Sequence, residues 1–423
     1  MTASSTRITA VKGTRDFYPE DMAFHNWLRN NIAAVSESFG YQAYDGPVLE
    51  RIELYAAKSG EELVQQQAFV LEDRGGDKLC LRPELTPTLA RMIAQKQREL
   101  RFPVRWYSFG AFWRYEQPQR GRTREFYQWN IDLLGSDSIA ADAEVIAAGA
   151  SLLQALGLTP DEVVIKVSSR QWLIARLLAA GIPQAAHLDV LHLIDRYDKL
   201  PAPAWLAQAR ALGLNDGQLS ALTAVLTDQD GWRQDPGLTE LLRELDHLGV
   251  LPFVEFDPRI VRGLDYYTGV VFEAKDRQGR FRSILGGGRY DNLVAAVGGD
   301  RVTGVGFAMG DVVIRVVLEE TGHLPALVLN PSRVFVTVFS DELRPISSKL
   351  AREFRAAGIP AEQSLTGDKL AKQLKRVNQL GIPWAVICGP DEAAAGLLTL
   401  RDMTSGGQQQ LALADAIALL IKV

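Results

Sequence analysis

Charged and aromatic side chains gather in one short stretch of this chain, FWRYEQPQRGRTREFYQ at residues 112–128. Strand-like aromatic residues stand on both sides of a polar loop that contains proline and glycine, which predicts a hairpin with a cationic tip. Its stems would place Arg114, Glu116 and Gln128 on one surface. An arginine fixed on a strand can hold a phosphate through two hydrogen bonds, and a basic tip suits a polyanion such as RNA. By itself, the same pattern also fits a solvated hairpin.

A second group of reactive residue types follows later, RGLDYYTG at residues 262–269 and GGGRYD at 286–291. An apolar strand has no need of Arg262, Asp265 and paired tyrosines at its start, whereas a binding site does. The glycine triplet would let a ligand approach the backbone closely. The alternative is a glycine-rich turn with a tyrosine packed on it.

Other kinds of site are disfavoured. The five histidines are scattered, the two cysteines lie far apart, and there is no P-loop or Gly-x-Ser-x-Gly elbow. A zinc site and a disulfide framework are therefore not expected, and phosphates would be bound by arginines. The net charge of −5 is modest, so any RNA contact must come from local patches. The composition, the lack of a long apolar run and the lack of a secretory signal predict a cytoplasmic enzyme with no membrane segment.

The elements that must position these residues follow from periodicity and turn signals. A chain of 423 residues predicts two or three domains. Apolar residues between Phe24 and Phe39 predict a helix, and residues 73–77 predict a hairpin turn. Further helices are expected to about Gln97 and over 140–156, and strands at 41–52 (interrupted at Pro47), 163–167, 253–256, 270–273 and 281–285. We expect a mainly antiparallel domain at 1–170 and 249–324, a helical insertion at 171–248, a linker at 325–332, and a small domain at 333–423.

The last domain alternates strand and helix, which predicts an α/β fold with a sheet that contains parallel pairs. It carries a positive balance inside a negative chain. Four of its cations recur at three- and four-residue steps on one expected helix: Lys369, Lys372, Lys375 and Arg376. A stripe of this kind is more often a solvated face than an RNA contact, and both interpretations stay open.

Together these segments resemble the histidyl-tRNA synthetases, a family of class II aminoacyl-tRNA synthetases. KGTRD at 12–16 resembles the N-terminal signature, Pro47 the proline of motif 1 at the dimer interface, and 114–128 motif 2. Residues 262–269 and 286–291 resemble the two segments peculiar to histidyl enzymes. The resemblance continues through GDKLAKQLK at 367–375 and GPDE at 389–392, in the anticodon-binding domain.

The resemblance implies a fold, an activity and partners. The fold would be an α+β class II catalytic domain, an antiparallel sheet flanked by helices with a helical insertion, followed by a C-terminal α/β anticodon-binding domain. The enzyme would join histidine to ATP, with Mg²⁺, as histidyl-adenylate and then transfer it to histidine tRNA. It would act as a homodimer in the cytoplasm, with no metal site made by protein side chains alone.

The resemblance also implies residue roles. Arg114 and Arg262 would hold the α-phosphate from two sides and stabilise the transition state. Histidine would be bound by Glu84, Thr86 and Gln128 at its α-ammonium side and by Asp132, Tyr266 and Tyr267 at its imidazole. The ATP site would comprise Arg114, Glu116, Arg122, Arg124 and Arg262. The tRNA would meet Gln117, Gln119, Lys369, Lys372, Lys375 and Arg376.

The sequence departs from the family pattern at three places. Motif 3 usually reads Gly-x-Glu-Arg-Leu, and its arginine holds the ATP γ-phosphate, but here GDVVI at 310–314 puts Val313 at that position. Arg315 would point about 200° away around the helix and so cannot substitute. Asp132 stands where bacterial members usually carry glutamate, and Tyr127 where histidine is common. Gln117 replaces a common arginine in the motif 2 loop.

A second interpretation remains. A non-catalytic relative of these synthetases regulates ATP phosphoribosyltransferase in histidine biosynthesis and resembles the same core. It generally lacks the anticodon domain and has a degraded motif 2 loop. The presence of residues 333–423 and of Arg114, Arg122, Arg124 and Arg262 favours the synthetase.

Overall fold

The computed structural model describes residues 8–56, 67–119 and 121–422. The chain divides into two compact units, 1–325 and 326–423, which are described separately. No helix within the described ranges is long and apolar enough to cross a membrane.

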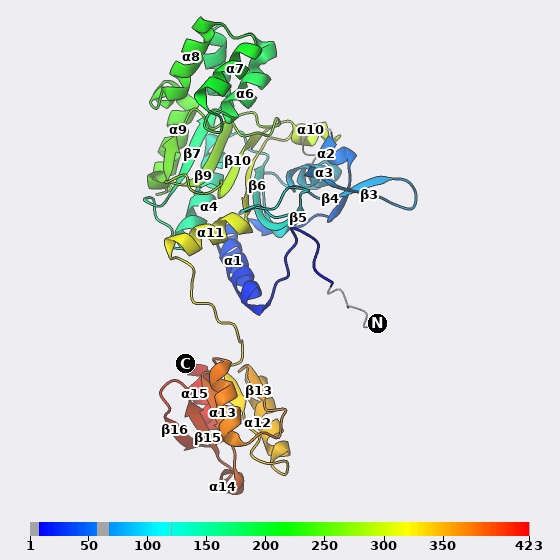
Figure 1. Cartoon of the computed structure of the whole chain (residues 1–423), viewed down its shortest axis with the longest axis vertical. Helices are drawn as coiled ribbons and strands as arrows, with labels where there is room; N and C mark the ends of the chain where they lie inside the picture. Colours follow the sequence, from blue (N-terminus) through cyan, green and yellow to red (C-terminus); the bar gives the residue numbers. More distant parts are fainter. Residues whose placement is uncertain (1–7, 57–66, 120, 423) are drawn as a thin grey trace, which may run out of the picture. The chain divides into compact units, whose positions relative to one another are not determined.

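An eight-stranded sheet is the centre of the first unit (Figure 1). Only its edge pairs, β1 with β5 and β7 with β8, are parallel, so the expected mainly antiparallel domain is confirmed. In spatial order the strands are β1 (Gln42–Ala43), β5 (Val104–Trp113), β6 (Glu125–Leu134), β11 (Gly304–Gly310), β10 (Leu285–Tyr290), β9 (Val270–Asp276), β7 (Val163–Ser169) and β8 (Val254–Phe256).

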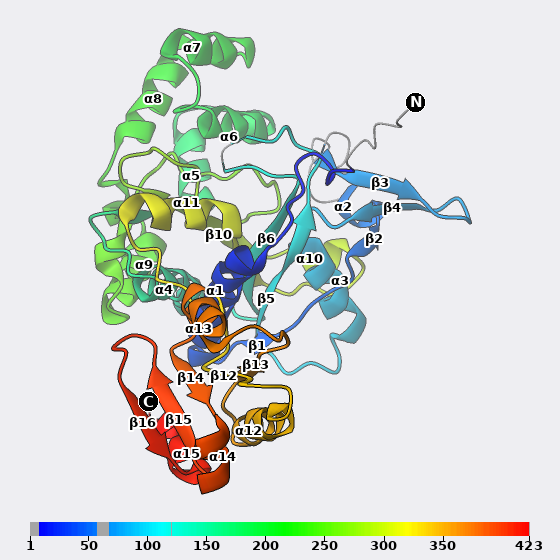
Figure 2. The same cartoon turned by 60° about the horizontal axis from the view of Figure 1, so that its bottom comes forward.

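Helices cover the two faces of this sheet differently (Figure 2). Alternate strand residues point to opposite faces. Gly149 of helix α4 packs on Leu285 and Phe307, which places α4 on the face that carries Ile131, the partner of Phe307 in the ladder. On that side lie α1 (Pro19–Ser38), α4 (Ile139–Ala155) and α11 (Asp311–Thr321). On the other side lie α3 (Thr86–Lys96) and α10 (Leu293–Ala296), which pack with Leu134 and Tyr290 and leave Asp132 facing a cavity.

A small antiparallel sheet lies beside the short helix α2 (Glu53–Ala56), which contacts β2. In spatial order its strands are β2 (Leu49–Arg51), β4 (Lys78–Leu81) and β3 (Phe69–Glu72). The predicted turn is confirmed, because Asp73 accepts hydrogen bonds from the backbone N–H groups of Gly75 and Asp77 at 2.7 and 2.9 Å. The strand expected over 41–52 is wrong as one element. Its two halves, β1 and β2, enter different sheets.

Residues 171–248 are helical, as predicted. They hold 3₁₀ turns at Gln184–Ala186 and Gly231–Gln234 and the helices α5 (Arg170–Ala179), α6 (His187–Asp195), α7 (Ala202–Ala211), α8 (Asp216–Thr227) and α9 (Pro236–His247). A third 3₁₀ turn at Leu251–Phe253 leads back into β8. Helices α6 to α8 form the part of the insertion that lies beyond the sheet (Figure 1).

The strand expected at 281–285 is also wrong. Residues 281–284 form a loop, and only Leu285 belongs to a strand. The N–H groups of Arg280 and Phe281 donate to Asp276 at 3.0 and 2.9 Å. The glycine triplet that follows is itself the strand, β10. A Cβ at Gly287 would collide with the backbone of Gly306 on β11, so glycine is what allows this close approach of two central strands.

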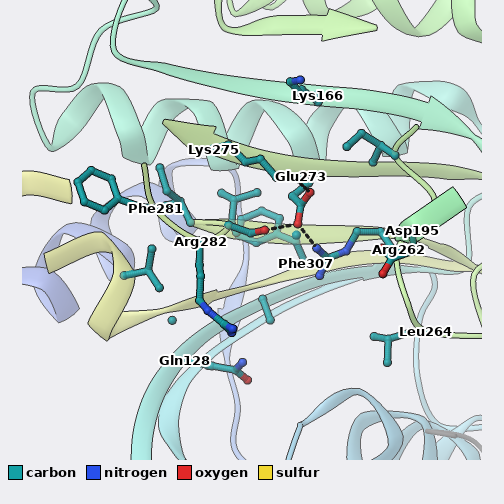
Figure 3. Close-up of a pocket in the computed structure, with 18 of the residues that line it drawn as sticks. Gln128, Lys166, Asp195, Arg262, Leu264, Glu273, Lys275, Phe281, Arg282 and Phe307 are labelled. Carbon is teal, nitrogen blue, oxygen red and sulfur yellow. Dashed lines mark hydrogen bonds and ion pairs between the residues drawn. The ribbon is translucent and has the colours of Figure 1, made fainter. Parts of the chain in front are cut away.

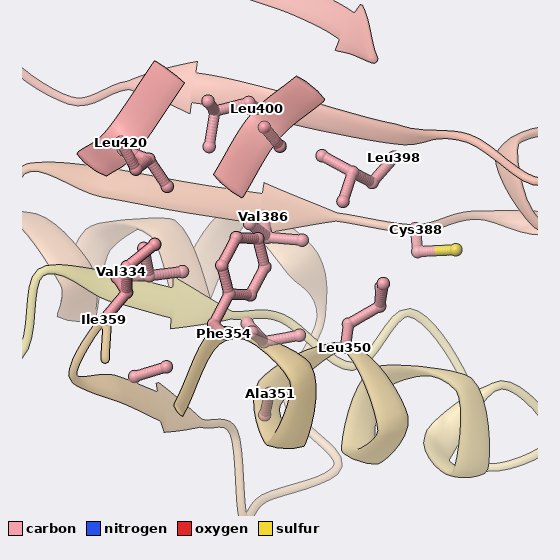
Figure 4. Packing of buried hydrophobic residues seen from close by; sticks show 13 residues of the cluster. Val334, Leu350, Ala351, Phe354, Ile359, Val386, Cys388, Leu398, Leu400 and Leu420 are labelled. Carbon is pink, nitrogen blue, oxygen red and sulfur yellow. The ribbon is translucent and has the colours of Figure 1, made fainter. Parts of the chain in front are cut away.

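The second unit is a five-stranded sheet in the order β13-β12-β14-β15-β16. β13, β12 and β14 are parallel and the other pairs antiparallel, which confirms the predicted α/β domain. Val334, Val386, Leu400 and Phe354 pack at its centre (Figure 4). Its elements are β12 (Val334–Val336), α12 (Arg344–Ala356), β13 (Ala361–Gln363), α13 (Leu370–Gln379), β14 (Trp384–Ile387), α14 (Pro390–Ala395), β15 (Leu398–Asp402), β16 (Gln408–Leu411) and α15 (Leu413–Lys422).

Candidate active site

A cavity of about 1010 Å³ lies on the sheet face opposite α4. Its walls come from the β5–β6 hairpin, the strands β6, β9, β10 and β11, the segment 259–267 and the end of α6. Two groups of residues far apart in sequence, around 114–132 and 262–290, therefore meet in one place. Most of the predicted site residues line this cavity: Glu84, Thr86, Arg114, Glu116, Arg122, Gln128, Asp132, Arg262, Tyr266 and Tyr267.

Two arginines reach the cavity from different elements. Nε of Arg114, just after β5, donates to the carbonyl of Pro83 at 2.9 Å, and its guanidinium lies 5.4 Å from the ring centroid of Phe126. Arg262 pairs with Glu273 of β9 at 2.7 Å (Figure 3). Within the described part of the chain, the buried Nε of Arg262 has no hydrogen-bond partner. Each guanidinium is thus fixed by one contact and has donors left for an anion.

The backbone that carries Arg262 is held in an unusual conformation. Its φ is +58°, in the left-handed region that a residue with a Cβ rarely adopts. The buried side chain of Arg170 donates to the carbonyls of Val261, Arg262, Leu264 and Tyr267 at 3.1, 2.9, 2.8 and 3.1 Å. Five guanidinium donors in a rigid plane suit such a set of carbonyls. Arg170 therefore stabilises the turn that aims Arg262 into the cavity.

Glycines make room for these side chains. A Cβ at Gly286 would collide with the guanidinium of Arg262, and one at Gly306 would overlap the carboxylate of Asp132. Both glycines belong to strands of the central sheet, and their φ values are not in the left-handed region. Their role is to leave space above the sheet.

Carboxyl, hydroxyl and amide groups also line the cavity. Tyr266 donates to Glu84 at 3.3 Å, and Tyr290 donates to Asp132 at 2.6 Å. Burial raises the pKa of Asp132 to about 7, although the hydrogen bond from Tyr290 opposes this effect. Among the described residues, the buried Oε1 of Gln128 has no hydrogen-bond partner. A carboxyl that titrates near pH 7, beside tyrosine hydroxyls, can accept a ring N–H when it is ionised.

The hairpin loop is held by its own charges. Arg122 pairs with Glu116, and both line the cavity. Arg124 does not line it. Its guanidinium lies 4.1 Å from the ring centroid of Tyr115, and its Nε donates to the carbonyl of Glu116 at 3.1 Å. Gln117 and Gln119 lie in the same loop, also outside the cavity lining.

The start of α11 carries no cation toward the cavity. Val313 lines the cavity, whereas Arg315 pairs with Asp21 at 2.8 Å and Glu319 at 3.0 Å outside it. Arg315 is thus on another face of the helix, as its position predicts. Asp311 binds the Arg15 guanidinium at 2.8 Å and so ties the N-terminal segment to this helix.

Several cavity residues were not predicted from the sequence. Tyr290 and Glu273 lay in segments that had been singled out, but only the fold shows that they contact Asp132 and Arg262. Burial raises the pKa of Glu273, but Arg262 and Lys275 outweigh this effect and hold it below its ordinary value. Arg282 and the insertion residue Asp195 had no signal in the sequence.

In the second unit, the cations of the stripe lie at the surface. Lys369, Lys372, Lys375 and Arg376 are exposed at the start and along one side of α13, and Lys372 pairs with Asp368 at 2.8 Å. This placement agrees with both interpretations of the stripe.

Comparisons with known proteins cover both units. The family model described as histidyl-tRNA synthetase matches residues 13–311, and the anticodon binding domain matches 333–423. The chain is 37% identical to the histidine–tRNA ligase of Leptospira biflexa serovar Patoc, over 96% of this chain and 95% of that protein. It is 36% identical to the chloroplastic/mitochondrial histidine–tRNA ligase of Arabidopsis thaliana, over 96% and 86%.

Solved structures give the same picture. The histidyl-tRNA synthetase from Nostoc sp. PCC 7120 has a TM-score of 0.84 and 26% identity, covering 99% of this chain and all of that one. A protein from Bacillus halodurans C described as an ATP phosphoribosyltransferase regulatory subunit/histidyl-tRNA synthetase has a TM-score of 0.73 at 24% identity. That likeness shows the fold alone.

Proposed function

The chain belongs to the histidyl-tRNA synthetases, class II enzymes that attach histidine to tRNA, and we propose that its cavity makes histidyl-adenylate. The observation that carries the proposal is the geometry of this cavity. Arg114 and Arg262 line the same cavity as the carboxylates of Glu84 and Asp132. Guanidiniums suit a triphosphate, and carboxylates suit an ammonium and a ring N–H.

In the first step, a carboxylate oxygen of histidine attacks the α-phosphorus of ATP. The bond between that phosphorus and the bridging oxygen breaks, and pyrophosphate leaves with the electron pair. Arg114 and Arg262 bind the non-bridging oxygens, which gain charge in the transition state. Glu273 and Arg170 act on Arg262, one through its guanidinium and the other through its backbone. In the second step, a terminal ribose hydroxyl of the tRNA attacks the carbonyl carbon, and AMP leaves.

Histidine is recognised at both nitrogens of its ring and at its α-ammonium group. Ionised Asp132 accepts the hydrogen bond of one ring N–H, and a hydroxyl of Tyr266 or Tyr267 meets the other nitrogen. Glu84, with Thr86 and Gln128, binds the α-ammonium group. A site that pairs both ring nitrogens rejects isosteres that lack one of them, because a buried polar group would then be left unsatisfied.

The reaction would use Mg²⁺ together with ATP. Among the described residues, no group of three or more His, Cys, Asp or Glu side chains gathers as a ready-made metal site. Mg²⁺ is commonly held by one or two carboxylates together with phosphates. Glu273, which lines the cavity and whose carboxylate remains ionised beside Arg262 and Lys275, is suited to this role. When bound, the ion neutralises charge on the leaving pyrophosphate.

Histidine tRNA would use both units. The 333–423 unit matches the anticodon binding domain, and the stripe on α13 supplies exposed cations for a phosphate backbone. Gln117 and Gln119 in the hairpin loop lie outside the cavity lining, where an acceptor end would approach. The regulatory alternative is not favoured, because Arg114, Arg122 and Arg262 converge in a cavity suited to catalysis.

We further propose a homodimer. The small sheet exposes apolar side chains at β2 and β3. Between 41% and 47% of the surface of each of these residues is exposed to solvent: Val48, Leu49, Val70 and Leu71. An exposed apolar patch of this kind suits a subunit interface. Light scattering on Leu49→Asp should show a smaller mass than on the unaltered protein. An unchanged mass would place the interface elsewhere. The free, buried Cys80 and Cys388 suit a reducing cytoplasm.

Histidine-dependent exchange of pyrophosphate into ATP tests the adenylation. We expect Arg262→Ala to lower the exchange rate by about 100- to 1000-fold, the usual effect of removing one preorganised donor. Arg315→Ala is the matched control, because this arginine lies outside the cavity. Near-normal exchange in Arg262→Ala would refute the assignment, and so would exchange that requires another amino acid.

A further inference from the structure

The cavity lining includes arginines that have no role in the reaction described for it, and Arg282 is one of them. Arg282 lies in the loop between β9 and β10 and lines the cavity. Its side chain runs away from Glu273 and Lys275 and ends on the side of Gln128 (Figure 3).

Other guanidiniums of the cavity lining have acidic partners, whereas Arg114 is held by the carbonyl of Pro83. Arg122 pairs with Glu116, Arg262 with Glu273, and Arg277 with Glu255 at 2.5 Å. Arg282 makes no hydrogen bond or ion pair with the residues that the structure describes. Arg282 is exposed to the solvent that fills the cavity, so its donors are free to bind the negative charge of a ligand.

Arg282 lies near the tip of the motif 2 hairpin. Burial lowers the pKa of Arg282, the positive charge of Arg122 lowers it further, and Glu116 opposes both effects. Two guanidiniums that repel each other at one wall favour a ligand with several negative charges between them.

The same wall contains the position where motif 3 lacks its arginine. A Cβ at Gly121, in the hairpin tip, would lie 3.9 Å from Cγ2 of Val313. Arg122, which follows Gly121 in the hairpin, Val313 of α11 and Arg282 therefore line one cavity, with the hairpin tip beside Val313. An apolar side chain at 313 leaves the terminal phosphates without the usual cation.

Both arginines lie close to the start of β10. Arg262, proposed to hold the α-phosphate, belongs to the segment before β9, and its guanidinium packs over Gly286 of β10. Arg282 lies four positions before Gly286, in the loop that leads into that strand. The two side chains therefore come from different segments and line the same cavity.

We propose that Arg282, together with Arg122, binds the terminal phosphates of ATP and takes the place of the motif 3 arginine. This inference rests on the proposed ATP site. Arg282 would stabilise the leaving group, pyrophosphate. As the α-phosphorus gains its bond to the carboxylate of histidine, the pyrophosphate gains the electron pair of the broken bond, and Arg282 stabilises that charge.

Direct binding of ATP and AMP to purified protein tests the inference, because AMP lacks the tail. We expect Arg282→Ala to weaken ATP binding by about 10- to 100-fold, the usual worth of charge-assisted hydrogen bonds. AMP binding should change less than about twofold. The KM for ATP in pyrophosphate exchange should rise in parallel. Arg282→Lys should lose less than Arg282→Ala, and adding Val313→Arg to Arg282→Ala should restore most of the affinity.

The matched control is Arg280→Ala, in the same loop but outside the cavity lining, with Asp276 as its partner at 3.6 Å. It should bind both nucleotides normally. Equal weakening of ATP and AMP in Arg282→Ala would overturn the inference, because it would show a general effect on the loop. Unchanged ATP binding in Arg282→Ala, with weakened binding in Arg114→Ala, would overturn the role of Arg282 and leave the proposed ATP site in place. Unchanged ATP binding in both variants would overturn the proposed ATP site itself.

Discussion

Replacing Tyr290 with phenylalanine should make histidine binding depend strongly on pH. The Tyr290 hydroxyl donates to Asp132 at 2.6 Å, and Asp132 must be ionised to accept a ring N–H of histidine. The pKa of Asp132 is already about 7 because the carboxyl is buried, and the hydrogen bond holds it down. Without that hydrogen bond, the ionised form loses its donor while its burial persists.

The size of the effect follows from the hydrogen bond. A hydrogen bond to a charged group stabilises it by about 1.5–3 kcal/mol, or about one to two pKa units at 1.36 kcal/mol each. The pKa of Asp132 in Tyr290→Phe would then be about 8–9. At pH 7.5 the ionised fraction falls from about three-quarters to between about 3% and 24%, so the KM for histidine should rise about 3- to 25-fold. At pH 9 the difference should shrink to about twofold or less.

The assay is pyrophosphate exchange at saturating ATP, with the KM for histidine measured from pH 6.5 to 9. Tyr107→Phe is the control, because Tyr107 donates to Glu37 at 2.9 Å outside the cavity lining. Asp132→Asn should abolish the dependence on this group. A loss in Tyr290→Phe that is the same at every pH would refute the reasoning and show that Tyr290 acts by shape. An unchanged KM at pH 7.5 would refute it too.

Three further outcomes are expected. Gly306→Ala should abolish histidine-dependent exchange, because its Cβ would overlap the carboxylate of Asp132. Gly310→Ala on the same strand is the control, because its Cβ would meet no atom within 4 Å and the variant should stay active. Equal activity of the two variants would contradict the geometry. Arg170→Lys should keep ATP binding within about threefold but lower kcat at least about tenfold, because one ammonium cannot satisfy several carbonyls, and a normal kcat would contradict that role. Removing residues 331–423 should reduce tRNA charging far more than exchange, and equal losses would mean that this unit is structural.

Much of the candidate site could be predicted because the hairpin and the two later segments carry their chemistry in consecutive residues. Periodicity likewise predicted α1, α4 and the helical insertion. The failures lie where the local pattern and the tertiary structure disagree. Residues 281–284 have strand-like composition but form a loop bound to Asp276, and the following glycines form the strand. Nothing local distinguishes a glycine needed in a turn from one needed between two packed strands.

The sequence by itself determined the family, the two-part organisation and most of the residues that line the cavity, because motif chemistry and hydrophobic period are local properties. Only the tertiary structure decided which residues act on one another. Arg170 meets the turn of Arg262 across 92 positions of chain, and Tyr290 meets Asp132 across 158. It also separated Arg282, which lines the cavity, from Arg124 and Arg315, which do not. Such pairings depend on strand register and on which face a side chain takes, and both are fixed only when the whole sheet assembles.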